Sequence, residues 1–270
     1  MSTKQTTQIQ RIDRDAFVSE TILMFTKFGD YLLTVESSLE RLKCSGLQQI
    51  LGTFGSSGRL NSREAKRFFN AHRKRFDRDM SRFCRYSAIT TLYSLFEVRA
   101  RLFAADFVKA YPHKPDFTKF SQMKENKNQG FVRIFQRWLE EDSMPVKLGH
   151  SRLWNQLQDL STIRNCITHD HGDATLVLNP RRTKDVVRRT RKIRFDDEGI
   201  LMIEAEFALS VCDHLHHFFK LLFRAAGYGM WMPPGYFPRM QEQFAGFEKE
   251  IVGGIAEYDL KQTINLGGCI

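Results

Sequence analysis

Residues 153–169, LWNQLQDLSTIRNCITH, place an arginine, an asparagine and a histidine at spacings that suit phosphate chemistry. Apolar residues recur there in steps of three and four, which predicts an amphipathic helix with one face in a core. On that helix Asn165 and His169, four residues apart, share one face, and Arg164 lies beside them. A guanidinium can grip a phosphate through two parallel hydrogen bonds, and an imidazole can move a proton near neutral pH. The group could therefore act on a phosphodiester.

The segment resembles the R-x4-H active-site motif of the HEPN superfamily, a group of small all-helical proteins many of which cut RNA. The matching residues are Arg164, Asn165 and His169, set late in the helix and followed by the glycine-containing break 171–173. The resemblance implies a metal-independent endoribonuclease without a cofactor, in which a ribose 2′-hydroxyl attacks the adjacent phosphodiester. His169 would be the general acid or base, Arg164 would stabilise charge on the phosphate oxygens, and Asn165 would hold the imidazole or the phosphate.

The resemblance also implies partners. RNA would be the substrate, and two copies of the chain would share one active cleft in a homodimer. Many members of the superfamily are toxins or act in antiviral defence by abortive infection, so an antitoxin or a defence-complex partner is a further expectation. The alternative is a non-catalytic helical RNA-binding or scaffold protein of a defence complex.

A long helix over residues 82–111 precedes the Arg-His helix, and apolar residues keep the helical period along it. This arrangement also fits the superfamily, and the resemblance covers roughly residues 82–226. Glu97 interrupts the apolar run. Either it pairs with Arg101 four residues on, at the surface, or its carboxylate orients Arg164 or His169 across the bundle.

Two other groups of residues allow different chemistry. A second R-x4-H pair, Arg67 and His72, lacks the asparagine and the helix stop, and is expected to have at most a part in RNA binding. Histidines and aspartates near residues 169–173 and 213–217 suggest a metal site, but they lack a fixed ligand spacing such as H-E-x-x-H. Cys166 has no nucleophile-elbow flanks and is expected to be a buried thiol. No metal or cofactor is therefore predicted.

The charge of the chain favours a polyanionic partner, because 41 basic residues face 31 acidic ones, a formal net charge of +10. Two stretches concentrate this excess: the predicted helix 62–80, and the run from Arg181 to Arg194, which has eight basic residues against one aspartate. The expected RNA contacts are Lys74, Arg75, Arg181, Arg182, Arg188, Arg189 and Arg191.

The sequence predicts a cytoplasmic protein with no membrane partner. Its five cysteines include no close pair, which is typical of a reducing compartment. The N-terminus is polar, and nowhere do 18 apolar residues follow one another.

The predicted fold is mainly α: a HEPN-like helical bundle with a short β-hairpin insertion and extra N-terminal helices. Residues 1–13 are expected to be a disordered lead-in, 14–80 an N-terminal helical region, 81–227 the HEPN-like domain with its hairpin near 191–205, and 228–270 a C-terminal extension. Within the N-terminal region, residues 44–61 are rich in glycine and serine and predict a flexible loop. A coiled-coil-like seam over residues 15–43 either packs on its own domain or serves self-association.

Overall fold

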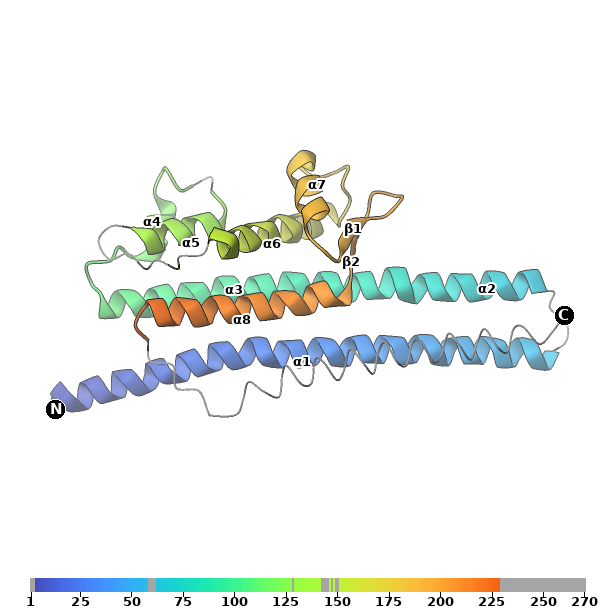
Figure 1. The fold of residues 1–270 in the computed structure, drawn as a ribbon, viewed down its shortest axis with the longest axis horizontal. Coiled ribbons are helices and arrows are strands. Elements are labelled where there is room, and N and C mark those ends of the chain that lie inside the picture. The colour runs from blue at the N-terminus through green and yellow to red at the C-terminus, as the bar shows by residue number, and fades with distance from the viewer. Residues whose placement is uncertain are drawn as a thin grey trace. The chain divides into compact units, whose positions relative to one another are not determined.

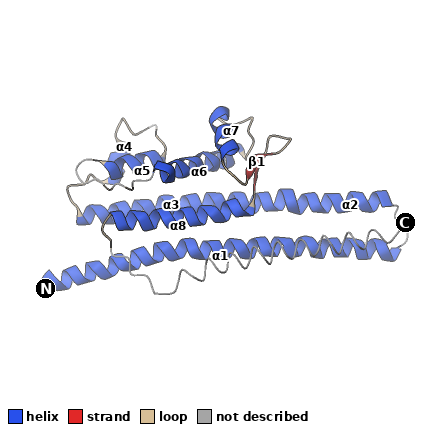
Figure 2. Ribbon diagram, in the orientation of Figure 1, coloured by secondary structure: helices blue, strands red, loops and turns tan. Residues whose placement is uncertain are grey.

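The structure, a computed structural model, is mainly α-helical with a short β-hairpin, as the sequence predicts (Figures 1 and 2). It describes residues 3–57, 62–127, 129–141, 146, 148 and 151–228. All of these belong to one compact unit, residues 1–229. The predicted C-terminal extension therefore lies outside the described residues, except for Tyr228 at its start.

The N-terminal part consists of two long helical segments. The first is α1 (Thr3–Ser57). The second begins with α2 (Ser62–Lys74), continues through the π-helical segment η1 (Arg75–Met80) and ends as α3 (Ser81–Ala110). Two predictions are wrong here: residues 3–13 belong to α1 instead of forming a disordered lead-in, and residues 44–57 continue α1 instead of forming a loop. Helix propagation adds one hydrogen bond for each residue, so a helix held by packing extends through residues that are poor helix formers.

The remaining elements follow α3 in short steps. They are α4 (Phe117–Gln122), α5 (Phe131–Glu140), α6 (Ser151–Asp170), α7 (Pro180–Arg189), β1 (Ile193–Phe195), β2 (Leu201–Ile203) and α8 (Ala205–Ala225). The strands pair antiparallel with Arg194 opposite Met202, which confirms the predicted hairpin. The basic run is more ordered than a solvated loop, because α7 occupies most of it and buries Thr183, Val186 and Val187.

Helix α3 lies between two groups of helices (Figure 1). On one side α1 and α8 pack against it and against each other, and on the other side it contacts α6, which carries α5 and α7. The N-terminal region thus shares one core with the rest of the unit, and no domain boundary falls at residue 80. Phe25 and Leu32 of the predicted seam are buried in this core, whereas Leu42 is 55% exposed. The seam therefore packs on its own domain, as the first of its two interpretations predicts.

Aromatic rings fill the space where α1, α3 and α8 meet. The Phe96 ring of α3 is fully buried, and its centroid lies 5.5 Å from that of Phe218 on α8. The neighbouring Phe219 ring of α8 stacks on Phe25 of α1 with 5.5 Å between centroids. Such pairs add about 0.5–1.5 kcal/mol each beyond the burial of their area, so these contacts join the three helices firmly.

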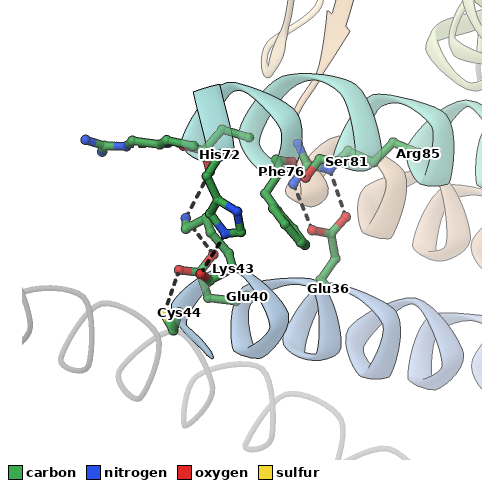
Figure 3. Close-up of polar contacts among 10 residues, drawn as sticks. Glu36, Glu40, Lys43, Cys44, His72, Phe76, Ser81 and Arg85 are labelled. Carbon is green, nitrogen blue, oxygen red and sulfur yellow. Dashed lines mark hydrogen bonds and ion pairs between the residues drawn. The ribbon is translucent and has the colours of Figure 1, made fainter. Parts of the chain in front are cut away.

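An ion pair fastens α1 to α3 and to the hairpin (Figure 3). The Arg85 guanidinium donates to both carboxylate oxygens of Glu36, at 2.8 Å each, and to the carbonyl of Ile203 at 2.9 Å. About a fifth of each charged side chain is exposed, so water screens this pair only in part.

Replacing Glu36 by glutamine should lower the free energy of unfolding by about 2 kcal/mol, because the half-buried Arg85 loses a charged acceptor for two hydrogen bonds. Urea denaturation measures the effect. The matched control is Glu20→Gln, since the Glu20–Arg99 contact between the same helices is 3.7 Å long and Glu20 is 68% exposed. The control should change stability by less than about 0.5 kcal/mol. Equal effects of the two substitutions would contradict the assigned role of Glu36.

Candidate active site

Helix α6 ends where the sequence predicts, immediately after His169 and Asp170. The next two residues have positive φ, 52° at His171 and 82° at Gly172, and the Gly172 amide donates back to the Cys166 carbonyl at 2.9 Å. This left-handed turn stops the helix, and it suits glycine, which has no Cβ to clash.

The turn after α6 is pinned to α3 and to the hairpin. Leu201 of β2 donates its amide to the Gly172 carbonyl at 2.8 Å, and Tyr86 of α3 donates its hydroxyl to the Leu201 carbonyl at 2.6 Å. A Cβ on Gly172 would lie 1.9 Å from the Tyr86 hydroxyl oxygen. The close approach of Tyr86 and Gly172 therefore sets where α6 ends relative to α3.

Arg164 lies against α3 near the C-terminal end of α6. One guanidinium nitrogen, Nη1, donates to Asn165 Oδ1 at 3.0 Å, and the guanidinium carbon lies 5.6 Å from the centroid of the Tyr93 ring. Tyr93 in turn donates its hydroxyl to Ser161 Oγ at 3.1 Å. The buried Nε of Arg164 has no hydrogen-bond partner among the described residues. An unsatisfied buried donor is unusual and often marks a site that a ligand or water completes.

Glu97 lies one turn beyond Tyr93 on α3, within electrostatic reach of Arg164. Burial raises the pKa of its carboxyl, while the positive charges of Arg164 and, to a smaller extent, Arg101 act against that rise. No hydrogen bond or ion pair of Glu97 is found among the described residues, so both interpretations of Glu97 stay predictions.

His169 is exposed on α6, one turn after the exposed Asn165. The structure thus joins Arg164 to Asn165, with Glu97 near enough for its charge to interact with that of Arg164, and His169 lies on the neighbouring solvent-facing side. No hydrogen bond joins His169 to the other three within the part of the chain that the structure describes. Tyr93 and Ser161 are site residues that the sequence argument missed. The position of Tyr93 four residues before Glu97 is the signal that could have found it, because that spacing places both on one face of α3.

The second Arg-His pair has a packing role (Figure 3). The His72 ring points from α2 toward α1, where its Nε2 lies 3.2 Å from the Lys43 carbonyl oxygen. A Cβ on Gly46 would be 2.2 Å from this ring, so a glycine of the predicted loop in fact allows the two helices to approach. Arg67 is exposed. The pair therefore has no shared site of the kind that Arg164 and Asn165 form.

All of the predicted RNA contacts are exposed, but some of them form ion pairs and others do not. Arg189 binds Asp159 of α6 through two hydrogen bonds, one of them 3.0 Å long, and Arg188 pairs with Asp185 at 3.2 Å. No ion pair of Arg181, Arg182 or Arg191 is found among the residues that the structure describes, and all three are exposed. Lys74 and Arg75, near the junction of α2 and η1, are exposed as well. The charge of α7 is thus available mainly at its N-terminus.

The alternative chemistries find little support in the described residues. The described residues contain no group of three or more histidine, cysteine, aspartate or glutamate side chains that could hold a metal ion. Cys166 is fully buried, and burial raises its pKa to about 12, which keeps it a thiol as predicted. Among the same residues, no helix is both long and apolar enough to cross a membrane.

Comparisons with models of protein families, with curated proteins and with solved structures found no match to this chain.

Replacing Gly172 by alanine should destabilise the unit, because the new Cβ meets Tyr86 and the residue keeps a positive φ. Gly199→Ala is the matched control, since Gly199 has a φ of 80° but nothing within 4 Å of a built Cβ. We expect a loss of about 1 kcal/mol for the control from backbone strain alone and at least about 2 kcal/mol more for Gly172→Ala from the contact. Thermal or urea unfolding would refute this account if both variants lost the same stability.

Proposed function

We propose that the protein is a metal-independent endoribonuclease that cuts RNA by attack of a ribose 2′-hydroxyl on the adjacent phosphodiester. One observation carries the proposal: Arg164 is held by Asn165 and Tyr93 beside the exposed end of α6, where His169 faces solvent. The resemblance to HEPN ribonucleases supports it, since Arg164, Asn165 and His169 match that motif.

The proposed reaction moves two protons. The 2′-oxygen loses a proton as it bonds to phosphorus, and the departing 5′-oxygen gains one as its bond to phosphorus breaks, leaving a cyclic phosphate. His169 would take up or deliver a proton, and Arg164 would stabilise the negative charge that grows on the phosphate oxygens. Because the nucleophile belongs to ribose, the activity would be specific for RNA over DNA.

A homodimer fits this chemistry. Each chain carries one Arg164–His169 set, and two proton transfers are best served by two imidazoles, one from each copy. Action as a cytoplasmic toxin or antiviral effector, held in check by an antitoxin or a defence complex, belongs to the proposal through the resemblance alone.

A second function is favoured by the arrangement of His169, which has no hydrogen bond to Arg164 in the described chain. In that case the protein would be a non-catalytic RNA-binding or scaffold protein, with its basic side chains as the functional ones. Cleavage assays separate the two functions directly.

Arg164→Ala and His169→Ala should each reduce RNA cleavage at least 100-fold with the fold intact, because each removes a group that acts on the reacting atoms. Cleavage of a labelled RNA in EDTA, with circular dichroism as the test of folding, measures the effect. The control variants are Arg67→Ala and His217→Ala, both exposed residues outside the site. Cleavage by either site variant at the wild-type rate would reject the site, and absence of cleavage by the wild type would favour the binding function.

The N-terminal arginines of α7 should guide RNA to the site. Replacing Arg181 and Arg182 by serine should weaken binding to all RNAs alike and lower the slope of log affinity against log salt by roughly 0.7 for each lost phosphate contact. The chemical step at saturating RNA should stay unchanged, because such contacts bind ground state and transition state equally.

The matched variant replaces Arg188 and Arg189, whose charges are already paired with Asp185 and Asp159. It removes the same formal charge and should lower the slope less. If the two double variants change the salt dependence equally, net charge and not the placement of Arg181 and Arg182 controls binding.

A further inference from the structure

Phe83 is an exposed aromatic residue in the first turn of α3, with 62% of its surface accessible. The guanidinium carbon of Arg82 lies 5.1 Å from the centroid of the Phe83 ring, a cation–π distance. The Nε of Arg82 is buried and has no hydrogen-bond partner among the described residues. An aromatic ring with an arginine over it is a common surface for stacking nucleic-acid bases.

The helical segment that leads to Phe83 is rich in positive charge. Residues 62–80 contain seven basic and three acidic side chains. Lys74, Arg78 and Arg82 follow one another at intervals of four residues, and the charges of all three lower the pKa of Glu198 in the hairpin turn, most strongly through the Arg78 hydrogen bond. These three side chains therefore line one edge of α2, η1 and α3.

Carboxylates of the hairpin turn bind to Arg78, the middle one of these three basic residues. Both terminal nitrogens of Arg78 donate to the Glu198 carboxylate, and Nη2 also lies 3.0 Å from Asp196 Oδ2. A forked pairing of this kind is also the geometry in which arginine binds a phosphate. The turn neutralises Arg78, while Lys74 and Arg75 remain exposed on the same segment.

Phe83 lies at the end of α3 that faces the C-terminus of α6. Tyr86, three residues after Phe83, is the side chain that a Cβ on Gly172 would meet, and Gly172 is three residues after His169. Phe83 and His169 thus belong to the same end of the α3–α6 pair, with the basic edge beyond Phe83. A strand bound along that edge would reach the candidate active site by passing Phe83.

We infer that Phe83, with Arg82, is a stacking platform for an unpaired base of single-stranded RNA that enters the candidate active site along the segment on which Lys74 and Arg75 are exposed. The inference rests on the proposed function for its ligand and adds the class of substrate, RNA with unpaired bases. Stacking tolerates any base because every base has a π face, so the platform favours single strands over duplexes without reading sequence.

The test measures binding of fluorescent RNA to the full-length chain with His169→Ala, so that cleavage does not interfere. The probes are a 12-nucleotide oligoadenylate, the same strand with abasic sites throughout and a 12-base-pair duplex RNA. Phe83→Leu, which keeps an apolar side chain without a π face, should weaken oligoadenylate binding roughly 5- to 150-fold, the range that corresponds to losing one stacked base. Phe83→Trp should bind as tightly as phenylalanine or more tightly. Binding of the abasic strand and of the duplex should not change.

Several results would overturn the inference. Phe83→Leu could leave oligoadenylate affinity unchanged, or it could lower the affinity for the abasic strand by the same factor as for oligoadenylate. The chain could also fail to bind RNA at all. Finally, Phe83→Leu could dissociate a dimer while RNA affinity is kept, which would make Phe83 a contact between copies. The proposed cleavage is judged separately with His169 in place. A chain that cuts no RNA but loses oligoadenylate affinity in Phe83→Leu would keep the platform and reject the nuclease.

Discussion

The burial of α3 on two sides is the constraint on which the rest of the structure depends. One side of this helix carries Phe96, which packs against α8, and another side carries Tyr86 and Tyr93, which contact the hairpin and α6. A helix with one apolar stripe needs one partner, whereas α3 needs partners on both sides. Helix α3 therefore holds the two groups of helices together, and it fixes the position of the candidate site relative to the core.

This arrangement has a chemical consequence for Arg164. A guanidinium at the surface of an isolated α6 would move freely in water, but here it contacts the Tyr93 ring of α3 and donates to Asn165 of α6. Limiting its motion lowers the entropy lost when it grips an anion.

Charge in this protein serves two distinct purposes. Some basic residues hold elements together, as Arg85 does with Glu36, Arg78 with Glu198 and Arg189 with Asp159. Others, such as Arg181 and Arg182, are exposed at the start of α7. Net charge alone cannot separate the two groups, because pairing depends on acids that are distant along the chain. Glu36 and Arg85 are 49 residues apart, and Arg78 and Glu198 are 120 apart.

Periodicity in the sequence determined most of the helical elements, since apolar spacing reports which face of a helix is buried. The helix over 82–111 and the Arg-His helix that stops at the break 171–173 both follow from that local pattern. Where the sequence was misleading, local composition disagreed with tertiary packing. Residues 44–57 contain glycines that suggest a loop, yet Gly46 lies in α1, where it makes room for His72.

Only the tertiary structure decided which polar residues meet. Arg164 and Asn165 are sequence neighbours whose common site could be expected, but the contact of Arg164 with Tyr93 depends on how α6 packs on α3. Lys114 is a clear case: in a loop rich in lysine and proline it is 1% exposed, because its ammonium donates to the carbonyls of Leu139 and Glu141 at the end of α5. Helical periodicity is a property of neighbouring residues and can be read along the chain. The partners of a buried charge come from distant segments, and packing alone brings them together.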